Sequence, residues 1–264
     1  SLATLALALA TAASAFAAEP DRHVVVISLD GFPAYYLNDP EVSLPNIRAL
    51  RDAGAATAEG MRVSNPSVTW PNHTTLMTGV RPEKHGVLFN GVPKREAGKP
   101  TTVAGERGQD ELVFVPLLFD HLKTVGLTSA AIDWPCTGDS KSLGDNWPDM
   151  PKSLSHTSPR LREELEKSGE AARFSAGGAA VHDEVWADTT VRIMRERKPN
   201  LMALHLLQLD STHHQHGPNT PQGRAAAATL DSLVGRVVQG VEAAGLKDKT
   251  TFFIVADHGF IGHS

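Results

Sequence analysis

The chain has 264 residues, and its 25 basic and 30 acidic side chains give a formal net charge of −5. This length allows one large domain with a sizeable core, and a hydrophobic content of 41% excludes a disordered chain. The single cysteine, Cys136, excludes a disulfide-stapled scaffold. The mild acidity argues against a nucleic-acid-binding groove, which needs a basic patch.

The N-terminal segment has the composition of an export signal. Residues 1–18 carry no charge and read SLATLALALATAASAFAA. The small residues on either side of Phe16 fit the cleavage rule, so residues 1–17 are predicted to be a signal peptide that lacks its own first residues. A retained membrane anchor is the alternative, although the run is short for a membrane span and no stable membrane partner is expected. The protein is therefore expected to be periplasmic or secreted.

Four apolar runs are typical of strands that are covered on both faces of a parallel sheet. They are rich in Val, Ile, Leu and Phe, and helical patterns separate them along the chain. In chain order these predicted strands cover residues 22–29, 127–133, 201–209 and 250–256. Strands that alternate with helices predict an α/β fold, a doubly wound and mostly parallel sheet with helices on both faces.

Helical spacing, with Pro or Gly at several ends, predicts the helices between these strands. Two polar segments rich in Gly and Pro fit neither pattern and are predicted to be irregular insertions at a pocket rim. The helices are predicted at 45–53, 71–78, 115–124, 160–168, 181–197 and 221–244, and the insertions near 92–111 and 134–158. Residues 18–264 are thus predicted to form one domain, truncated at its C-terminus because a complete α/β domain would continue beyond the last strand.

An aspartate stands at the end of three of the predicted strands: Asp30, Asp210 and Asp257. Ligands of doubly wound sheets bind beyond the carboxyl ends of the strands, so these carboxylates are expected to converge. His214 lies four residues after Asp210, and His258 follows Asp257 directly. Carboxylate and imidazole ligands together are typical of zinc, and two metals about 4 Å apart form a clamp for displacement at phosphorus.

These residues also have plain structural interpretations. An aspartate after a strand is most often a turn former or a helix cap, and Thr69 alone would be a helix N-cap. The metal hypothesis depends on the convergence of three carboxylates, because buried carboxylates need partners. A Thr hydroxyl at a helix N-terminus is well placed against an anion, which makes Thr69 the candidate nucleophile.

The motifs resemble the nucleotide pyrophosphatase/phosphodiesterase family of the alkaline phosphatase superfamily. A Thr followed by an aromatic residue, Pro, Asn and His is a specific signature of that family, and the signature of sulfatases is absent. The similar segments follow the family's order over residues 24–260: Ser28 to Phe32, Thr69 to His73, Thr78 to Asn90, Asp210 to Pro218, and Asp257 to Gly259.

The resemblance implies a two-zinc hydrolase of phosphodiester or phosphoanhydride bonds that forms a covalent phospho-threonine on Thr69. Asn90 would donate a hydrogen bond to a phosphoryl oxygen, and Trp70 would form one face of a base-stacking slot, with packing in the core as the alternative for Trp70. The implied partner is a nucleotide-type diester or pyrophosphate. The ligands of one zinc would be Asp30, Thr69, Asp257 and His258, and those of the other Asp210, His214 and a further residue expected beyond position 264.

Two other functions stay open at this point. A phosphonoacetate hydrolase of the same superfamily would use the same Thr and metals with a small carboxylate-binding pocket. A metal-binding protein without turnover would bind zinc but form no covalent intermediate on Thr69. Asp133 departs from the family's Phe-Trp-Pro segment, which puts a nucleoside specificity in question.

Overall fold

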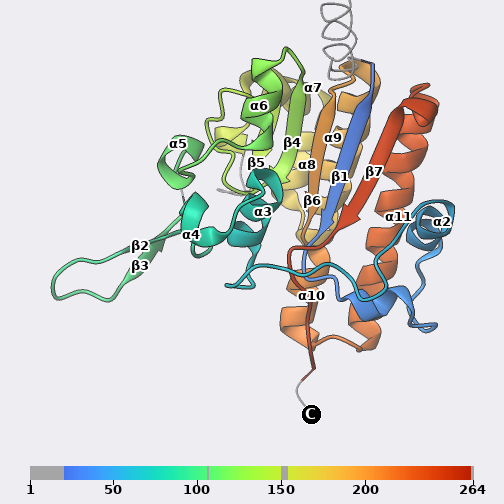
Figure 1. The fold of residues 1–264 in the computed structure, drawn as a ribbon, viewed down its shortest axis with the longest axis horizontal. Helices are drawn as coiled ribbons and strands as arrows, with labels where there is room; N and C mark the ends of the chain where they lie inside the picture. Colours follow the sequence, from blue (N-terminus) through green and yellow to red (C-terminus); the bar gives the residue numbers. More distant parts are fainter. Residues whose placement is uncertain (1–20, 106, 150–153, 263–264) are drawn as a thin grey trace, which may run out of the picture.

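The computed structural model describes residues 21–105, 107–149 and 154–262. The predicted signal peptide lies outside these ranges. Within them, a five-stranded sheet has the order β5-β4-β6-β1-β7, and its neighbouring strands are parallel (Figure 1). The strands are β1 His23–Leu29, β4 Ser129–Trp134, β5 Asp145–Pro148, β6 Leu201–Leu206 and β7 Thr250–Val255.

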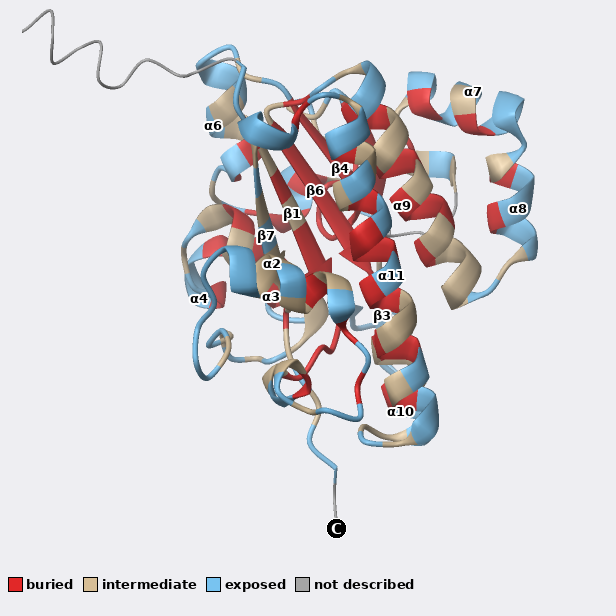
Figure 2. Cartoon of the chain, turned by 90° about the vertical axis from the view of Figure 1, so that its right-hand side faces the viewer, coloured by how far each residue is buried: buried red, intermediate tan, exposed pale blue. Residues whose placement is uncertain are grey.

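Helices cover both faces of the sheet, which confirms the predicted doubly wound α/β architecture (Figures 1 and 2). Along β1, Val25 and Ile27 belong to one hydrophobic core, while Val24 and Val26 pack against the other. This two-sided burial explains the unbroken apolar sequence of the strand. The first core contains residues of α2 Pro45–Ala53, α7 Pro159–Ser168, α8 Glu170–Ala176, α9 Ala179–Glu196 and α11 Pro221–Ala243, and the second contains residues of α3 Thr69–Thr78 and α6 Leu118–Thr124.

Three expectations about local structure need correction. The segment 134–158 is not wholly irregular, because β5 within it pairs in parallel with β4 at the edge of the sheet. The segment 92–111 contains an antiparallel hairpin that projects from the body of the molecule (Figure 1). The strand predicted over 201–209 ends at Leu206, and a helix follows it. The elements involved are β2 Val92–Lys94, β3 Thr102–Ala104, α4 Pro82–His85, α5 Gln109–Leu112 and α10 Gln208–His216.

The carboxyl ends of β1, β6 and β7 meet at one edge of the sheet, on the side where α10 begins (Figure 1). Since Asp30 and Asp257 follow β1 and β7, and α10 follows β6, this edge is where the predicted site residues gather. Over the described part of the chain, no helix has both the length and the apolar character needed to cross a membrane.

Candidate active site

The five predicted carboxylate and imidazole ligands lie together at this edge. Single ligand atoms of Asp30, Asp210 and His258 all lie within 4.8 Å of one another. His258 Nε2 is 3.2 Å from Asp30 Oδ1, 3.8 Å from Asp210 Oδ1 and 3.4 Å from Asp257 Oδ2. His214 Nε2 is 3.4 Å from Asp210 Oδ1, one helical turn further along α10. The convergence expected from the sequence is therefore present.

The carboxylate of Asp257 joins the turn after β7 to the turn after β1 by a side-chain-to-backbone hydrogen bond. Asp257 Oδ1 accepts from the N–H of Gly31 at 3.2 Å and from the N–H of His258 at 2.9 Å. Gly31 has a φ of +66°, and a Cβ there would lie 2.6 Å from the ring of Phe260. Glycine suits this position because it adopts positive φ readily and leaves room for the ring. The turn thus brings the carboxylates of Asp30 and Asp257 to the same place.

Asp210 lies in the first turn of α10 and not at a strand end, as the sequence pattern had suggested. The helix begins early because a buried carboxylate caps it from a neighbouring helix. Asp183 on α9 is fully buried, and its two oxygens accept from the N–H groups of Leu207 and Gln208 at 2.9 and 3.0 Å. These bonds satisfy two of the free donors of a helix N-terminus. The Asp183 carboxylate therefore fixes the N-terminus of α10, the helix on which Asp210 and His214 lie.

The oxygen atoms of the cluster have the character of a cation site. Asp30 Oδ1, Asp210 Oδ1 and Asp257 Oδ2 are buried and have no hydrogen-bond partner within the described ranges. Buried polar atoms in native proteins almost always have partners, so three such oxygens in one cluster call for a bound group. Oxygen atoms of carboxylates with imidazole nitrogens form a donor set that suits zinc. The residues present therefore fit a divalent metal.

The titration behaviour of the cluster points the same way. Burial, together with the charge of Asp30, raises the pKa of Asp257 to about 8 and that of Asp210 to about 6. Burial acts to raise the pKa of Asp30 as well, but the hydrogen bond with His205 and the close contact with the His258 imidazole outweigh it and hold this pKa well below its usual range. The carboxylates of Asp30, Asp210 and Asp257 thus lie together with too few positive charges nearby to stabilise all three in the ionised form. A divalent cation would favour their ionised forms and release protons on binding.

Thr69 opens helix α3, and the described contacts connect it to the cluster through His73. The Nδ1 of His73 lies 2.9 Å from the backbone oxygen of Thr69 and 3.8 Å from Asp257 Oδ2. Burial lowers the pKa of His73 to about 3, so the ring is neutral and Nδ1 donates to the Thr69 carbonyl. The Thr69 side chain is partly exposed and does not cap the helix, whose N-cap residue is Val68.

Asn90 lies beside the first turn of α3. Its Oδ1 accepts from the backbone N–H of Trp70 at 2.8 Å, and the residue is exposed. Since this contact occupies the carbonyl oxygen of the amide, the Nδ2 group carries the remaining donors. The hydrogen bond thus holds the side-chain amide of Asn90 next to Trp70, the residue after Thr69.

The structure packs Trp70 in the core, whereas the family resemblance implied a base-stacking role. Its side chain is only 3% exposed and belongs to the core around α3 and α6. Its Nε1 donates to Asp149 Oδ2 at 2.8 Å, which satisfies the indole donor inside the protein. A ring buried in this way offers no open face to a substrate.

Sequence reasoning missed a buried histidine behind the cluster. His205 lies near the carboxyl end of β6, is fully buried, and contacts Asp30 and Asp133. The available signal was its place inside the otherwise apolar run LMALHLLQL, where a polar ring needs a partner. Asp133, which departs from the family pattern, is such a partner, and the two polar residues together could have indicated the contact.

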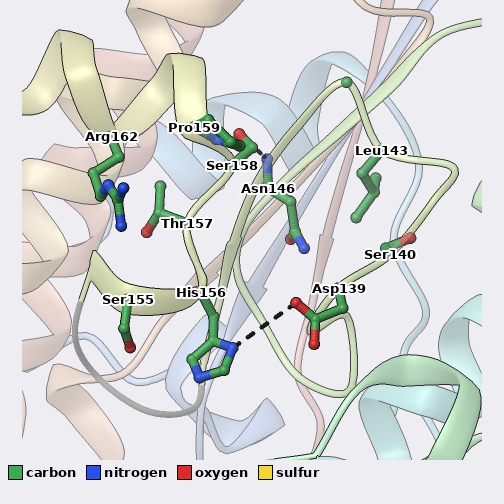
Figure 3. A pocket seen from close by; sticks show the side chains of 11 residues that line it. Asp139, Ser140, Leu143, Asn146, Ser155, His156, Thr157, Ser158, Pro159 and Arg162 are labelled. Carbon is green, nitrogen blue, oxygen red and sulfur yellow. Dashed lines mark hydrogen bonds and ion pairs between the residues drawn. The ribbon is translucent and has the colours of Figure 1, made fainter.

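A cavity of about 610 Å³ lies elsewhere, between the loop around Asp139 and the start of α7 (Figure 3). His156 and Asp139 face each other across part of it, with the His156 Nδ1 4.0 Å from Asp139 Oδ1. None of the candidate ligands lines this cavity. It is therefore distinct from the cluster at the sheet edge.

The fold and the cluster together define an α/β protein with a carboxylate and imidazole site of the kind that holds metal ions. The family model for type I phosphodiesterase/nucleotide pyrophosphatase matches residues 24–263. This match covers nearly the whole described chain, and the chain belongs to that family.

The relatives are much longer proteins. Venom phosphodiesterase 2 of Crotalus adamanteus is 25% identical over 240 residues, which is 89% of this chain and 26% of the relative. Ectonucleotide pyrophosphatase/phosphodiesterase family member 1 of Homo sapiens is 27% identical over 237 residues, with 89% and 23% covered. The chain spans about a quarter of the length of these curated relatives.

Solved structures share the fold. Murine ectonucleotide pyrophosphatase/phosphodiesterase 5, as an inactive variant in complex with AMP, matches with a TM-score of 0.62 and 19% identity. The match covers 90% of this chain and 57% of the murine chain. The human protein of the same name gives the same values. These similarities confirm the alkaline-phosphatase-like α/β fold.

Proposed function

We propose that residues 18–264 are a catalytic domain of a phosphodiesterase or nucleotide pyrophosphatase that depends on two zinc ions. The observation that carries the proposal is the convergence of five predicted ligands, with three buried oxygens that lack partners among the described residues. The family match supports hydrolysis of phosphodiester or phosphoanhydride bonds. The export signal expected in residues 1–17 and the venom and ectoenzyme relatives support a secreted or periplasmic location.

The metal ligands are assigned by the family resemblance and supported by the geometry. Zinc in such a site supplies Lewis-acid stabilisation of phosphoryl oxygens and favours the ionised forms of a hydroxyl group and of water. The first ion would have Asp30, Thr69, Asp257 and His258 as ligands, and the second Asp210 and His214.

The protein's own groups then divide the reaction into two displacements. The Thr69 Oγ1 forms a bond to phosphorus while the bond from phosphorus to the leaving oxygen breaks. Water next attacks phosphorus, the bond to Thr69 breaks, and the net change is hydrolysis of one phosphoester or anhydride bond. The positive end of the α3 dipole favours a phosphate beside Thr69, while the N–H of Trp70 is occupied by Asn90 and Pro71 has no N–H.

Asn90 is expected to donate from Nδ2 to a phosphoryl oxygen in the transition state. Asn90→Asp keeps an acceptor for the N–H of Trp70 but removes the donor, whereas Asn90→Ala removes both. Loss of one such donor lowers kcat about 100- to 1,000-fold. We expect both variants to show this loss in steady-state kinetics, and Asn90→Asp to keep the wild-type melting temperature. Wild-type kcat in Asn90→Asp would remove Asn90 from the mechanism.

A nucleotide-type substrate is favoured by the names of the relatives and by the AMP complex of the murine protein. The direct comparison is hydrolysis of p-nitrophenyl thymidine monophosphate against phosphonoacetate, each with zinc present. We expect release of p-nitrophenol and no measurable release of phosphate from phosphonoacetate. The reverse result would reassign the chain to the phosphonoacetate hydrolases. Zinc binding with turnover of neither substrate would indicate a binding protein.

A further inference from the structure

His205 is a polar residue in an apolar setting, and the mechanism above does not use it. The side chain lies on β6, the strand between β1 and β4, and is 0% exposed. A buried imidazole is costly unless its nitrogen atoms have hydrogen-bond partners. Both ring nitrogens of His205 have partners, which lie at the carboxyl ends of the two neighbouring strands, β1 and β4.

The contacts of the ring reach to both sides of β6. His205 Nε2 is 3.0 Å from Asp30 Oδ2, at the end of β1. His205 Nδ1 is 2.9 Å from the backbone oxygen of Asp133 and 3.1 Å from Asp133 Oδ2, on β4. Asp133 has a φ of 53°, a left-handed conformation that Asp tolerates better than most residues. The ring is therefore held at both nitrogens and cannot turn freely.

A third contact closes one side of the ring. His73 packs against His205 with ring centroids 4.3 Å apart and an interplanar angle of 61°. The same His73 is bonded to the backbone oxygen of Thr69. The orientation of His205 is thus fixed by β4, by Asp30 and by the helix that carries the candidate nucleophile.

Fixing the ring also fixes the Asp30 carboxylate. One of its oxygens, Oδ2, is occupied by His205, and the other, Oδ1, is turned to the cluster, where it lies 3.2 Å from His258 Nε2. Oδ1 is buried and has no hydrogen-bond partner in the described ranges. A metal-ligating carboxylate held through its second oxygen is oriented for the metal, and such outer contacts change metal affinity substantially.

We propose that His205, held by Asp133, is a positioning residue that fixes Asp30 for metal binding. The inference rests on the zinc assignment in the proposed function, and it adds two residues that are not among the predicted metal ligands. Asp133 departs from the Phe-Trp-Pro segment of the family, and its backbone and carboxylate oxygens lie 2.9 and 3.1 Å from His205 Nδ1. Asp133 and Asp30 thus hold the His205 ring from opposite sides.

Two substitutions of His205 by an amide side chain distinguish a role in positioning Asp30 from a role in packing the core. In His205→Gln the side-chain amide reaches the position of Nε2 and can still donate to Asp30. In His205→Asn the shorter amide reaches the position of Nδ1, next to Asp133, and leaves Asp30 Oδ2 without its partner. The matched control is His85→Asn, since His85 is also fully buried but contacts Thr75 and not the cluster.

The measurement is the zinc dissociation constant of each variant, from competition with a chromophoric chelator, beside the melting temperature of the metal-free protein. We expect His205→Asn to bind zinc about 10- to 100-fold more weakly than the wild type, which is the usual cost of losing such an outer contact. His205→Gln should stay within about three-fold of the wild type on the same physical ground. His85→Asn should lower the melting temperature and leave zinc affinity unchanged.

Equal zinc affinity in His205→Asn and His205→Gln would overturn the inference, whatever their melting temperatures. If His205→Asn does not fold, His205→Gln is compared with His205→Leu, which keeps a side chain of similar size and removes both ring nitrogens. The Leu variant must then bind zinc more weakly than His205→Gln, and equal affinity again refutes the inference. A wild-type protein that binds no zinc would refute the proposed metal site itself, and this result is distinguishable from failure of the His205 inference alone.

Discussion

Replacing Thr69 with Ala is expected to lower kcat at least ~1,000-fold, because loss of a nucleophile removes the covalent route as a whole. The melting temperature of the metal-free protein should change by less than ~2 °C, as for a surface substitution of under about 0.5 kcal/mol. The side chain is partly exposed and does not cap α3, so its loss removes no structural contact of that kind. Steady-state kinetics and calorimetry on the same preparation check both parts.

Two further variants are the controls for the loss of activity in Thr69→Ala. Thr69→Ser keeps a hydroxyl and should retain measurable turnover. Thr78→Ala at the other end of α3 removes a hydroxyl that donates to the Thr74 backbone oxygen, and it should keep wild-type kcat. Rapid quenching with a slow substrate should trap an adduct on a Thr69 peptide by mass spectrometry. Thr69→Ala with more than a tenth of wild-type activity would show that another group attacks phosphorus.

Removal of the metal is expected to abolish turnover and to destabilise the fold. Without a cation, three buried carboxylate oxygens accept no hydrogen bond in the described structure, and burial beside the Asp30 charge disfavours the ionised forms of Asp210 and Asp257. A ligand at 100 times its dissociation constant stabilises the folded state by about 2.7 kcal/mol. For a chain of this size we expect zinc to raise the melting temperature by about 5–10 °C over the chelated protein. Differential scanning calorimetry with chelator and with zinc measures this shift.

The control for the metal effect is a carboxylate outside the cluster. Asp257→Ala should lose most of the zinc-dependent rise in melting temperature, because Asp257 Oδ2 is one of the orphaned oxygens. Asp139→Ala, at the separate cavity near α7, should keep the full rise. An equal response to zinc in the two variants would place the metal somewhere other than the proposed site.

Much of the fold could be read from the sequence because the sheet is parallel and covered on both faces. Burial on two sides makes β1 a continuous apolar run, whereas the edge strand β7 is apolar although Thr251 and Phe253 are exposed, and the chain must turn at the carboxyl ends of both. Asp30 and Asp257 could therefore be placed at one edge from sequence position alone. The helices were predictable from their spacing because each packs one face against the sheet.

The remaining features depend on contacts between distant segments. The start of α10, and hence the position of Asp210 within a helix, depends on the carboxylate of Asp183 some twenty residues earlier. The short strand β5 follows a polar segment and gains its stability by pairing with β4. Trp70 could belong to a binding slot or to the core, and only its partner Asp149 decides between them.

The most direct test is a crystal structure of the protein with zinc, with anomalous diffraction recorded at the zinc edge. The account predicts a strong anomalous peak bounded by Asp30 Oδ1, Asp257 Oδ2 and His258, close to the hydroxyl of Thr69. It predicts a second peak against Asp210 and His214. Well-ordered zinc found only at other positions, with Asp30 and Asp257 left without a cation, would contradict it.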